Sequence, residues 1–425
     1  MIKKTLFVAF LIFLQSIFSQ NEIASSISTT QIEEKTATIN DSLIKIRRDL
    51  HKYPELAGNE KRTSEKVAAY LEALGLEVHK NIGGYGVVGV LQGRDGGKKI
   101  AWRADMDALS STAPDPVEFK SENKGIRHIC GHDVHTTIGL GIANVLSSLK
   151  EDWAGTMYFI FQPSEENYQG AQEMLSDGIM EIIDPDEIYA LHVTAFPQGY
   201  TAVKAQNPYS FTNRLDVIYK TTKDLDEITE FTKKLVKNHV RIPADARFSD
   251  YNSLGDPEVG IASAQTIFTD YLTLASDFKV EENPENLKIS VYVNSSNKKQ
   301  LDSLLSDLKL TIKKSKFANT LEQVIYTNKK GTVVNDEALT AKAIESISKA
   351  YGKSKIIPLY GVIPGNVGDD FSYFQDEIPG VYFFLGGSNF EKGIIANPHA
   401  PNFMVDEACI QTGVELFSSF LLDRL

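Results

Sequence analysis

The chain is poor in cysteine, and this shortage limits how it can be held together. Among its 425 residues only Cys130 and Cys409 are cysteines, so at most one disulfide can form. We expect Cys130 to have another use, because polar residues surround it. We expect Cys409 to be buried as a small hydrophobic residue. We find no internal repeats and no long low-complexity tract, which leaves an ordinary globular chain.

Positive charge is also in deficit. Lysine and arginine number 44 against 56 aspartates and glutamates, and the formal net charge is −12. Nucleic acids and anionic membranes bind basic surfaces, so we expect neither as a partner. With 42% hydrophobic and 24% charged residues, the chain can form one large domain and one smaller domain.

Long apolar runs are scarce, and the one that stands out lies at the N-terminus. It follows two lysines and ends at Leu14, with small and polar residues after it. This pattern predicts a secretory signal peptide over residues 1–20, cleaved near Ser19 or Gln20, because the run is shorter than the roughly 20 residues that span a bilayer. We therefore expect an exported protein, periplasmic or secreted, without stable membrane association after cleavage. An uncleaved N-terminal anchor is the alternative.

The spacing of apolar residues divides the remaining chain into three parts. Strands alternate with helices over 21–204 and again over 323–425, which predicts one α/β domain with a mainly parallel central sheet. The segment 205–322 combines alternating strand patterns with two charged amphipathic helices, which is typical of a small α+β domain. We therefore expect a large domain that is interrupted by an inserted satellite domain.

Individual elements follow from the same spacing. The expected helices are 41–51, 61–74, 134–149, 224–237, 298–313, 337–350 and 406–422. The expected strands are 86–91, 99–103, 156–161, 187–191, 286–293 and 381–385. Asp133 is the expected N-cap of the helix that follows it.

Polar residues with metal-binding or acid–base chemistry gather just beyond the predicted strands of the large domain. They are Asp105, Asp107, Glu165, Glu166, His192 and His399, with Cys130 and His132 in a loop that leads into a helix. In an open parallel sheet, functional residues gather beyond the carboxyl ends of the strands. Each of these residues alone is more often a solvated or core residue than a ligand, so the shared placement is the informative signal.

A thiolate, imidazoles and a carboxylate suit a borderline-soft divalent ion such as Zn²⁺. Cys130 and His132 are two positions apart, so both can reach one centre, and a charged thiolate can bridge two ions. Two neighbouring ions can clamp a carbonyl group and activate water. Of the adjacent pair Glu165 and Glu166, one carboxylate can bind metal while the other acts as a general base.

A series of motifs, taken in chain order, resembles the aminoacylase/carboxypeptidase family of two-metal peptidases. Within it, the chain is most similar to the branch of hippurate hydrolase and indole-acetyl-amino-acid hydrolase, which are N-acyl-amino-acid amidohydrolases. The motifs are Leu50-His-Lys-Tyr-Pro-Glu55, Asp105-Met-Asp-Ala-Leu109, His128-Ile-Cys-Gly-His-Asp-Val-His135, Phe161-Gln-Pro-Ser-Glu-Glu166, Leu191-His-Val193, Asp370-Phe-Ser-Tyr-Phe374, Val381-Tyr-Phe-Phe-Leu-Gly386 and Asn397-Pro-His-Ala-Pro401. They cover about residues 43–200 and 325–425.

The resemblance implies a zinc-peptidase-like catalytic domain with an inserted ferredoxin-like satellite domain, which is often used to form a homodimer. It implies two divalent metal ions per subunit, Zn or Mn, and a small substrate, an N-acyl amino acid or a short peptide. It assigns Cys130 as the bridging ligand, Glu165 as the general base and Asp107 as a residue that orients a ligand from behind. The remaining implied ligands are His132, Glu166, His192 and His399; His51, Asp133 and His135 match the pattern with supporting roles only.

The satellite segment departs from the pattern of the family. Residues 215–224 contain neither the glycine nor the histidine that the resemblance calls for, and the usual asparagine and arginine are not evident around 276–292. Asp369 stands where a glutamate is common. Three readings stay open: a hydrolase with unusual specificity, a hydrolase whose substrate is held by other satellite residues, and a metal-binding protein that binds peptides or N-acyl amino acids without turnover.

Overall fold

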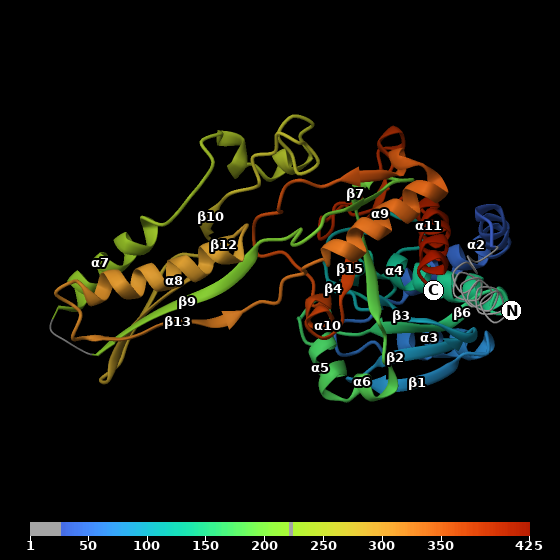
Figure 1. Cartoon of the computed structure of the whole chain (residues 1–425), viewed down its shortest axis with the longest axis horizontal. Helices are drawn as coiled ribbons and strands as arrows, with labels where there is room; N and C mark the ends of the chain where they lie inside the picture. Colours follow the sequence, from blue (N-terminus) through green and yellow to red (C-terminus); the bar gives the residue numbers. More distant parts are fainter. Residues whose placement is uncertain (1–26, 221–223) are drawn as a thin grey trace, which may run out of the picture.

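The computed structural model describes residues 27–220 and 224–425, and the predicted signal peptide lies outside these ranges. Figure 1 shows a large α/β domain, built from both ends of the chain, and a smaller domain that projects from it. Within the described ranges, no helix is long and apolar enough to cross a membrane.

An eight-stranded sheet forms the centre of the large domain. Its strands, in spatial order, are β1 (Glu77–Ile82), β2 (Gly86–Gln92), β6 (Ala154–Gln162), β3 (Arg94–Asp105), β7 (Glu187–Pro197), β15 (Gly380–Ser388), β8 (Thr201–Val203) and β14 (Ile356–Pro358). The four central strands, β6, β3, β7 and β15, run parallel to one another. Antiparallel pairs occur towards both edges, at β1–β2, β2–β6 and β15–β8. The predicted α/β class with a mainly parallel sheet is confirmed.

Helices cover both faces of this sheet, which explains the continuous apolar runs of its central strands. Along β15, Phe383 belongs to the core on one face, while Tyr382 and Phe384 belong to the core on the other. This alternation follows from the two-residue period of a strand. The helices of the large domain are α2 (Thr29–Lys52), α3 (Lys61–Ala73), α4 (His132–Ser148), α5 (Gly170–Ser176), α6 (Ile179–Ile182), α9 (Glu337–Tyr351), α10 (Phe371–Glu377) and α11 (Ala408–Arg424).

Two helix starts differ from the sequence-based expectation. Helix α2 begins at Thr29, well before position 41, because Ser28 and Gln31 form a capping box. Helix α4 is preceded by Gly131 at φ 98°, so Asp133 is not the N-cap. The carboxylate of Asp133 instead lies 2.9 Å from Arg47 Nε and 2.9 Å from His51 Nδ1, because burial of this charge requires charged and hydrogen-bonding partners.

The smaller domain is an antiparallel sheet with helices packed against it. Its elements are β9 (Phe211–Lys220), α7 (Leu225–Lys237), β10 (Leu272–Leu274), β11 (Lys279–Glu282), β12 (Asn286–Ser295), α8 (Lys298–Lys313) and β13 (Leu321–Lys329). The strand order is β10-β12-β9-β13, with β11 also paired to β12. Apart from the additional short strand β11, this is the β-α-β-β-α-β succession of the ferredoxin-like arrangement. Because β13 stays in this sheet to Lys329, the chain leaves the smaller domain after residue 329 rather than at 323.

Short elements complete the described chain. They are the strands β4 (Leu109–Ser110) and β5 (Ile126–Arg127) and the 3₁₀ helices η1 (Ala246–Ser249), η2 (Tyr251–Gly255), η3 (Lys353–Lys355) and η4 (Phe390–Lys392). Both cysteines are buried and free, so the expected burial of Cys409 is confirmed and no disulfide links it to Cys130.

Candidate metal centre

The thiol of Cys130 lies where distant parts of the chain meet. Its Sγ is 3.3 Å from His192 Nε2 and 3.2 Å from His399 Nε2. Cys130 precedes α4, and His399 lies in the loop after β15. His192 does not follow its strand as expected, because β7 continues to Pro197. Its pairing with β3, however, stops at Ala190, so His192 lies beyond the part of β7 that pairs with β3, although it still pairs with β15.

Two groups of potential ligands share Cys130. One consists of Cys130, His132 and His192, and the other of Cys130, Glu166 and His399, with the ligand atoms of each group within 4.8 Å of one another. His132 Nε2 lies 3.7 Å and His399 Nε2 lies 3.3 Å from Glu166 Oε1. This arrangement is what two ions bridged by one thiolate require.

Two of these atoms are buried without a hydrogen-bond partner in the described chain, namely His132 Nε2 and Glu166 Oε1. Buried polar atoms are rarely left unsatisfied, because the loss of hydration is costly. A cation between them would satisfy both atoms. The donor set and these orphaned atoms therefore fit two divalent ions.

Asp107 orients one residue from each of the two ligand groups without itself pointing a free oxygen at the ligand atoms. Its Oδ1 accepts a hydrogen bond from His132 Nδ1 at 3.0 Å, and its Oδ2 accepts one from the backbone N–H of Glu166 at 2.9 Å. Because Nδ1 of His132 carries the proton, its Nε2 presents a lone pair to the site. His192 is fixed in the same way, since its Nδ1 donates to the carbonyl oxygen of Val193 at 2.8 Å.

His135 lies close to these ligands, but both of its ring nitrogens form hydrogen bonds to other residues. Its Nδ1 donates to Asp105 Oδ1 at 2.6 Å, and its Nε2 accepts the backbone N–H of Val193 at 2.8 Å. The other oxygen of Asp105 accepts a hydrogen bond from Arg103 Nη1 at 2.6 Å. His135 and Asp105 therefore support the site without a free ligand atom.

Glu165 is a buried carboxyl group at the edge of the ligand cluster. It is 5% exposed, and its Oε2 lies 3.9 Å from His132 Nε2. Burial raises the pKa of Glu165 well above its ordinary value, and the carboxylates of Asp369 and Glu166 act in the same direction. A carboxyl group with a raised pKa can accept and return a proton near neutral pH.

An ion cluster below Glu165 contains residues that the sequence analysis gave no role. Arg103 is fully buried and lies 3.0 Å from oxygens of both Asp369 and Asp370. Gln162 joins it, accepting from Arg103 Nε at 2.8 Å. The signal in the sequence was a charged residue inside an apolar strand, because arginine is almost never fully buried without partners.

The backbone is constrained at two points of the centre. Gly131 has φ 98°, and a Cβ atom there would lie 2.3 Å from Val193 Cγ1, so only glycine fits. His399 adopts φ 64°, which is rare for a residue with a side chain. Its backbone N–H donates to the carbonyl oxygen of Ile129 at 2.7 Å, which holds the loop in this conformation.

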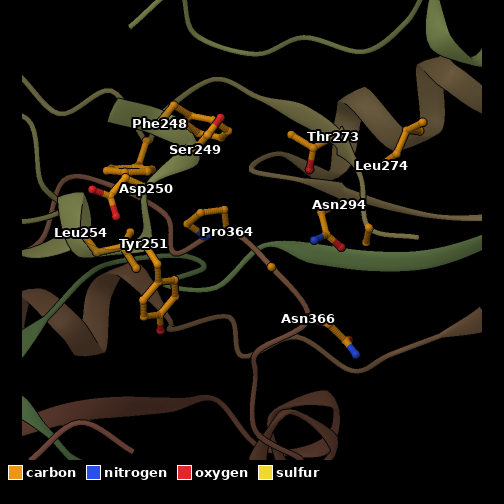
Figure 2. A pocket seen from close by; sticks show the side chains of 13 residues that line it. Phe248, Ser249, Asp250, Tyr251, Leu254, Thr273, Leu274, Asn294, Pro364 and Asn366 are labelled. Atoms are coloured by element: carbon orange, nitrogen blue, oxygen red, sulfur yellow. The ribbon is translucent and has the colours of Figure 1, made fainter. Parts of the chain in front are cut away.

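A separate pocket of about 300 Å³ lies between the smaller domain and the loop that precedes α10. Figure 2 shows Phe248, Tyr251, Asn294, Pro364 and Asn366 around it. None of the residues that line it is a candidate metal ligand, so it is not the metal centre.

Comparison with known proteins identifies the family. Residues 101–423 match the family model described as peptidase family M20/M25/M40. Thermostable carboxypeptidase 1 of Saccharolobus solfataricus is 30% identical over 390 residues, which cover 90% of this chain and 95% of that protein. IAA-amino acid hydrolase ILR1-like 4 of Arabidopsis thaliana is 27% identical, covering 93% and 90% of the two chains.

A solved structure shares the fold. The YXEP protein of Bacillus subtilis, described as a dinuclear metal binding peptidase from the M20 family, superposes with a TM-score of 0.69 at 22% identity and covers 91% of this chain and 98% of that one. The resemblance seen in the motifs is confirmed, as is the predicted enzyme class, a metal-dependent hydrolase of amide or peptide bonds. The chain belongs to peptidase family M20/M25/M40.

Proposed function

We propose that the protein is an exported amidohydrolase that cleaves the amide bond of N-acyl amino acids or small peptides with a water molecule. The observation that carries this proposal is the convergence of Cys130, His132, Glu166, His192 and His399, with Glu165 beside them. Two divalent ions held by these five residues, Zn or Mn, would polarise the scissile carbonyl and acidify water.

The protein residues supply positioning and proton transfer. Cys130 belongs to both ligand groups and would therefore contribute its thiolate to both ions. The buried carboxylate of Glu165 takes a proton from the attacking water and later returns it to the leaving amine. Asp107 keeps His132 and the backbone of Glu166 in place during both steps.

The substrate class rests on the relatives. One relative is named a carboxypeptidase and another an IAA-amino acid hydrolase, and both names describe the hydrolysis of an amide bond next to an amino acid. These names support N-acyl amino acids or short peptides as substrates here. Export to the periplasm or the medium rests on the N-terminal pattern, and a homodimer through the smaller domain rests on the resemblance.

Glu165→Gln tests the assignment of the base. We expect this variant to bind both ions and to lose at least about 100-fold in kcat, because general acid–base catalysis contributes about 10²- to 10⁴-fold. The measurements are metal content by elemental analysis and turnover of N-acetyl and N-benzoyl amino acids and dipeptides with added Zn²⁺ or Mn²⁺. Glu173→Gln, at an exposed position on α5, is the matched control.

Two outcomes would contradict the proposal. Activity of Glu165→Gln close to that of the unchanged protein would remove Glu165 from the role of base. If the unchanged protein binds metal and ligands yet hydrolyses none of the panel, the binding protein without turnover becomes the better description.

A further inference from the structure

Lys330 occupies the point where the chain returns from the smaller domain to the large one. It follows β13 directly, and its backbone N–H donates to the carbonyl oxygen of Thr212 at 3.2 Å. Its ammonium lies 3.7 Å from the ring centroid of Tyr168, which is a cation–π distance. Tyr168 follows Glu166 by two positions, and the charges of Glu165 and Glu166 act on the Lys330 ammonium, so Lys330 lies near the metal centre.

The ammonium of Lys330 has no carboxylate partner and can donate a further hydrogen bond. Its Nζ donates to the carbonyl oxygen of Asn366 at 3.2 Å, while Asn366 Oδ1 lies at 3.5 Å. No carboxylate of the described residues lies within 4.0 Å of it. An ammonium group has three N–H donors, and a partly buried charge is costly unless a counter-charge approaches. The group is therefore prepared to receive an anion.

The carboxylates of the site influence Lys330 from a greater distance. Burial lowers the pKa of Lys330, and Glu165, Glu166 and Asp369 oppose this effect. Glu166 would be engaged with metal in the proposed function, and Asp369 is bound to Arg103 and to the hydroxyl group of Tyr382. Glu166 and Asp369 therefore have other partners, and Glu165 is kept for proton transfer in the proposed function.

Arg103 is another cationic side chain that interacts with Glu165, but it cannot reach a substrate. It is fully buried and bound to Asp105, Asp369 and Asp370. Lys330 differs because it is only partly buried and forms no ion pair with the described residues; its contacts are with Asn366 and Tyr168. Of these two cations, Lys330 is the one that a substrate anion can reach.

We propose that Lys330 binds the free carboxylate of the substrate and so makes the enzyme selective for acylated amino acids and peptides that end in a carboxylate. This proposal rests on the proposed function, since it concerns the substrate of the same site. The competing structural role is a clamp: Lys330 and Tyr168 would merely hold the loop around Asn366, which also lines the pocket in Figure 2.

Lys330→Met separates the two roles when it is assayed with a pair of substrates, an N-acyl amino acid and the same compound with its carboxylate converted to an amide. We expect KM for the carboxylate substrate to rise about 10- to 100-fold, because this is the range for a hydrogen bond to a charged group. We expect kcat for that substrate and both constants for the amide to change little. Lys330→Arg should recover most of the preference, because it keeps the charge.

Lys204→Met is the matched control. Lys204 is also partly buried, and its pKa is lowered by burial alone, without the carboxylates of the site. We expect this variant to keep the preference for the carboxylate substrate. An equal loss on both substrates in Lys330→Met, or an unchanged preference, would overturn the proposal and leave Lys330 as a clamp.

Binding keeps the proposal testable if turnover is absent. Calorimetry on Zn²⁺-loaded protein would compare the two compounds in the unchanged chain and in Lys330→Met. If the unchanged chain hydrolyses neither compound, the proposed function fails. Tighter binding of the carboxylate compound that disappears in Lys330→Met would still support Lys330 as the anion-binding residue, whereas equal binding would refute it.

Discussion

At the scale of single residues, Asp107 orients candidate ligands of both groups. One oxygen fixes the proton position of His132 and the other fixes the backbone at Glu166, so one side chain orients a ligand from each of the two groups. Such supporting carboxylates govern metal affinity although they do not touch the ion.

Asp107→Asn should weaken metal binding by about 10- to 100-fold without abolishing it, as is usual when such a supporting residue is replaced. An asparagine side chain keeps the shape but can accept only one of the two hydrogen bonds. Competition with a calibrated chelator measures the affinity, and the exposed Asp95→Asn is the control. An affinity equal to that of the unchanged protein would show that Asp107 does not orient the ligands.

The candidate ligands could be predicted from residue type and order, because cysteine, histidine and glutamate side chains carry metal-binding chemistry wherever they stand. The hydrogen-bond partners of the neighbouring residues could not be predicted in this way. His135 matches the same motif as His132, yet its two nitrogens bind Asp105 and Val193. Only the folded arrangement separates a histidine with a free nitrogen from one without.

At the scale of elements, Glu187 ties the C-terminal helix to the central sheet. It lies at the start of β7, and its carboxylate accepts from Arg424 Nε near the end of α11 at 3.0 Å. Lys98 Nζ at 2.6 Å and the Tyr189 hydroxyl at 2.6 Å donate to it as well. Burial raises the pKa of Glu187, but these hydrogen bonds outweigh burial and lower it to about 2.

The stability contributed by Glu187 should therefore depend on pH. Its pKa is lower in the folded chain than the value of about 4.3 expected in the unfolded chain, so its contribution is present above that value and is lost as the pH falls toward 2. Glu187→Gln should cost about 1.5 to 3 kcal/mol in the free energy of unfolding at pH 7, the range for hydrogen bonds to charged groups. The difference from the unchanged protein should vanish near pH 2.

Denaturant unfolding of both proteins across this pH range is the measurement, with Glu181→Gln on α6 as an exposed control. A difference that stays constant down to pH 2 would mean that the charge of Glu187 is not what ties α11 to the sheet.

At the scale of the whole molecule, the proposed export depends on the N-terminal segment rather than on the domains. We expect the mature protein to begin near residue 20, because the basic start and short apolar run fit a cleaved signal. Intact-mass measurement of protein from the culture medium or periplasm would show the loss of this segment. A full-length mass in a membrane fraction would instead indicate the uncleaved anchor.

The α/β class and the types of residue in the candidate site could be predicted from the sequence. Strand and helix periods recur over short windows, so the α/β class and the satellite domain could be inferred locally, and the ligand types are properties of single residues. Contacts between residues that are distant in the sequence became visible only in the tertiary structure. Cys130 meets His399 from the far end of the chain, Arg103 is buried among aspartates, and Lys330 arrives beside Tyr168 through the return from the smaller domain. Such contacts depend on how the chain folds over long sequence separations, and short-range sequence patterns do not encode this.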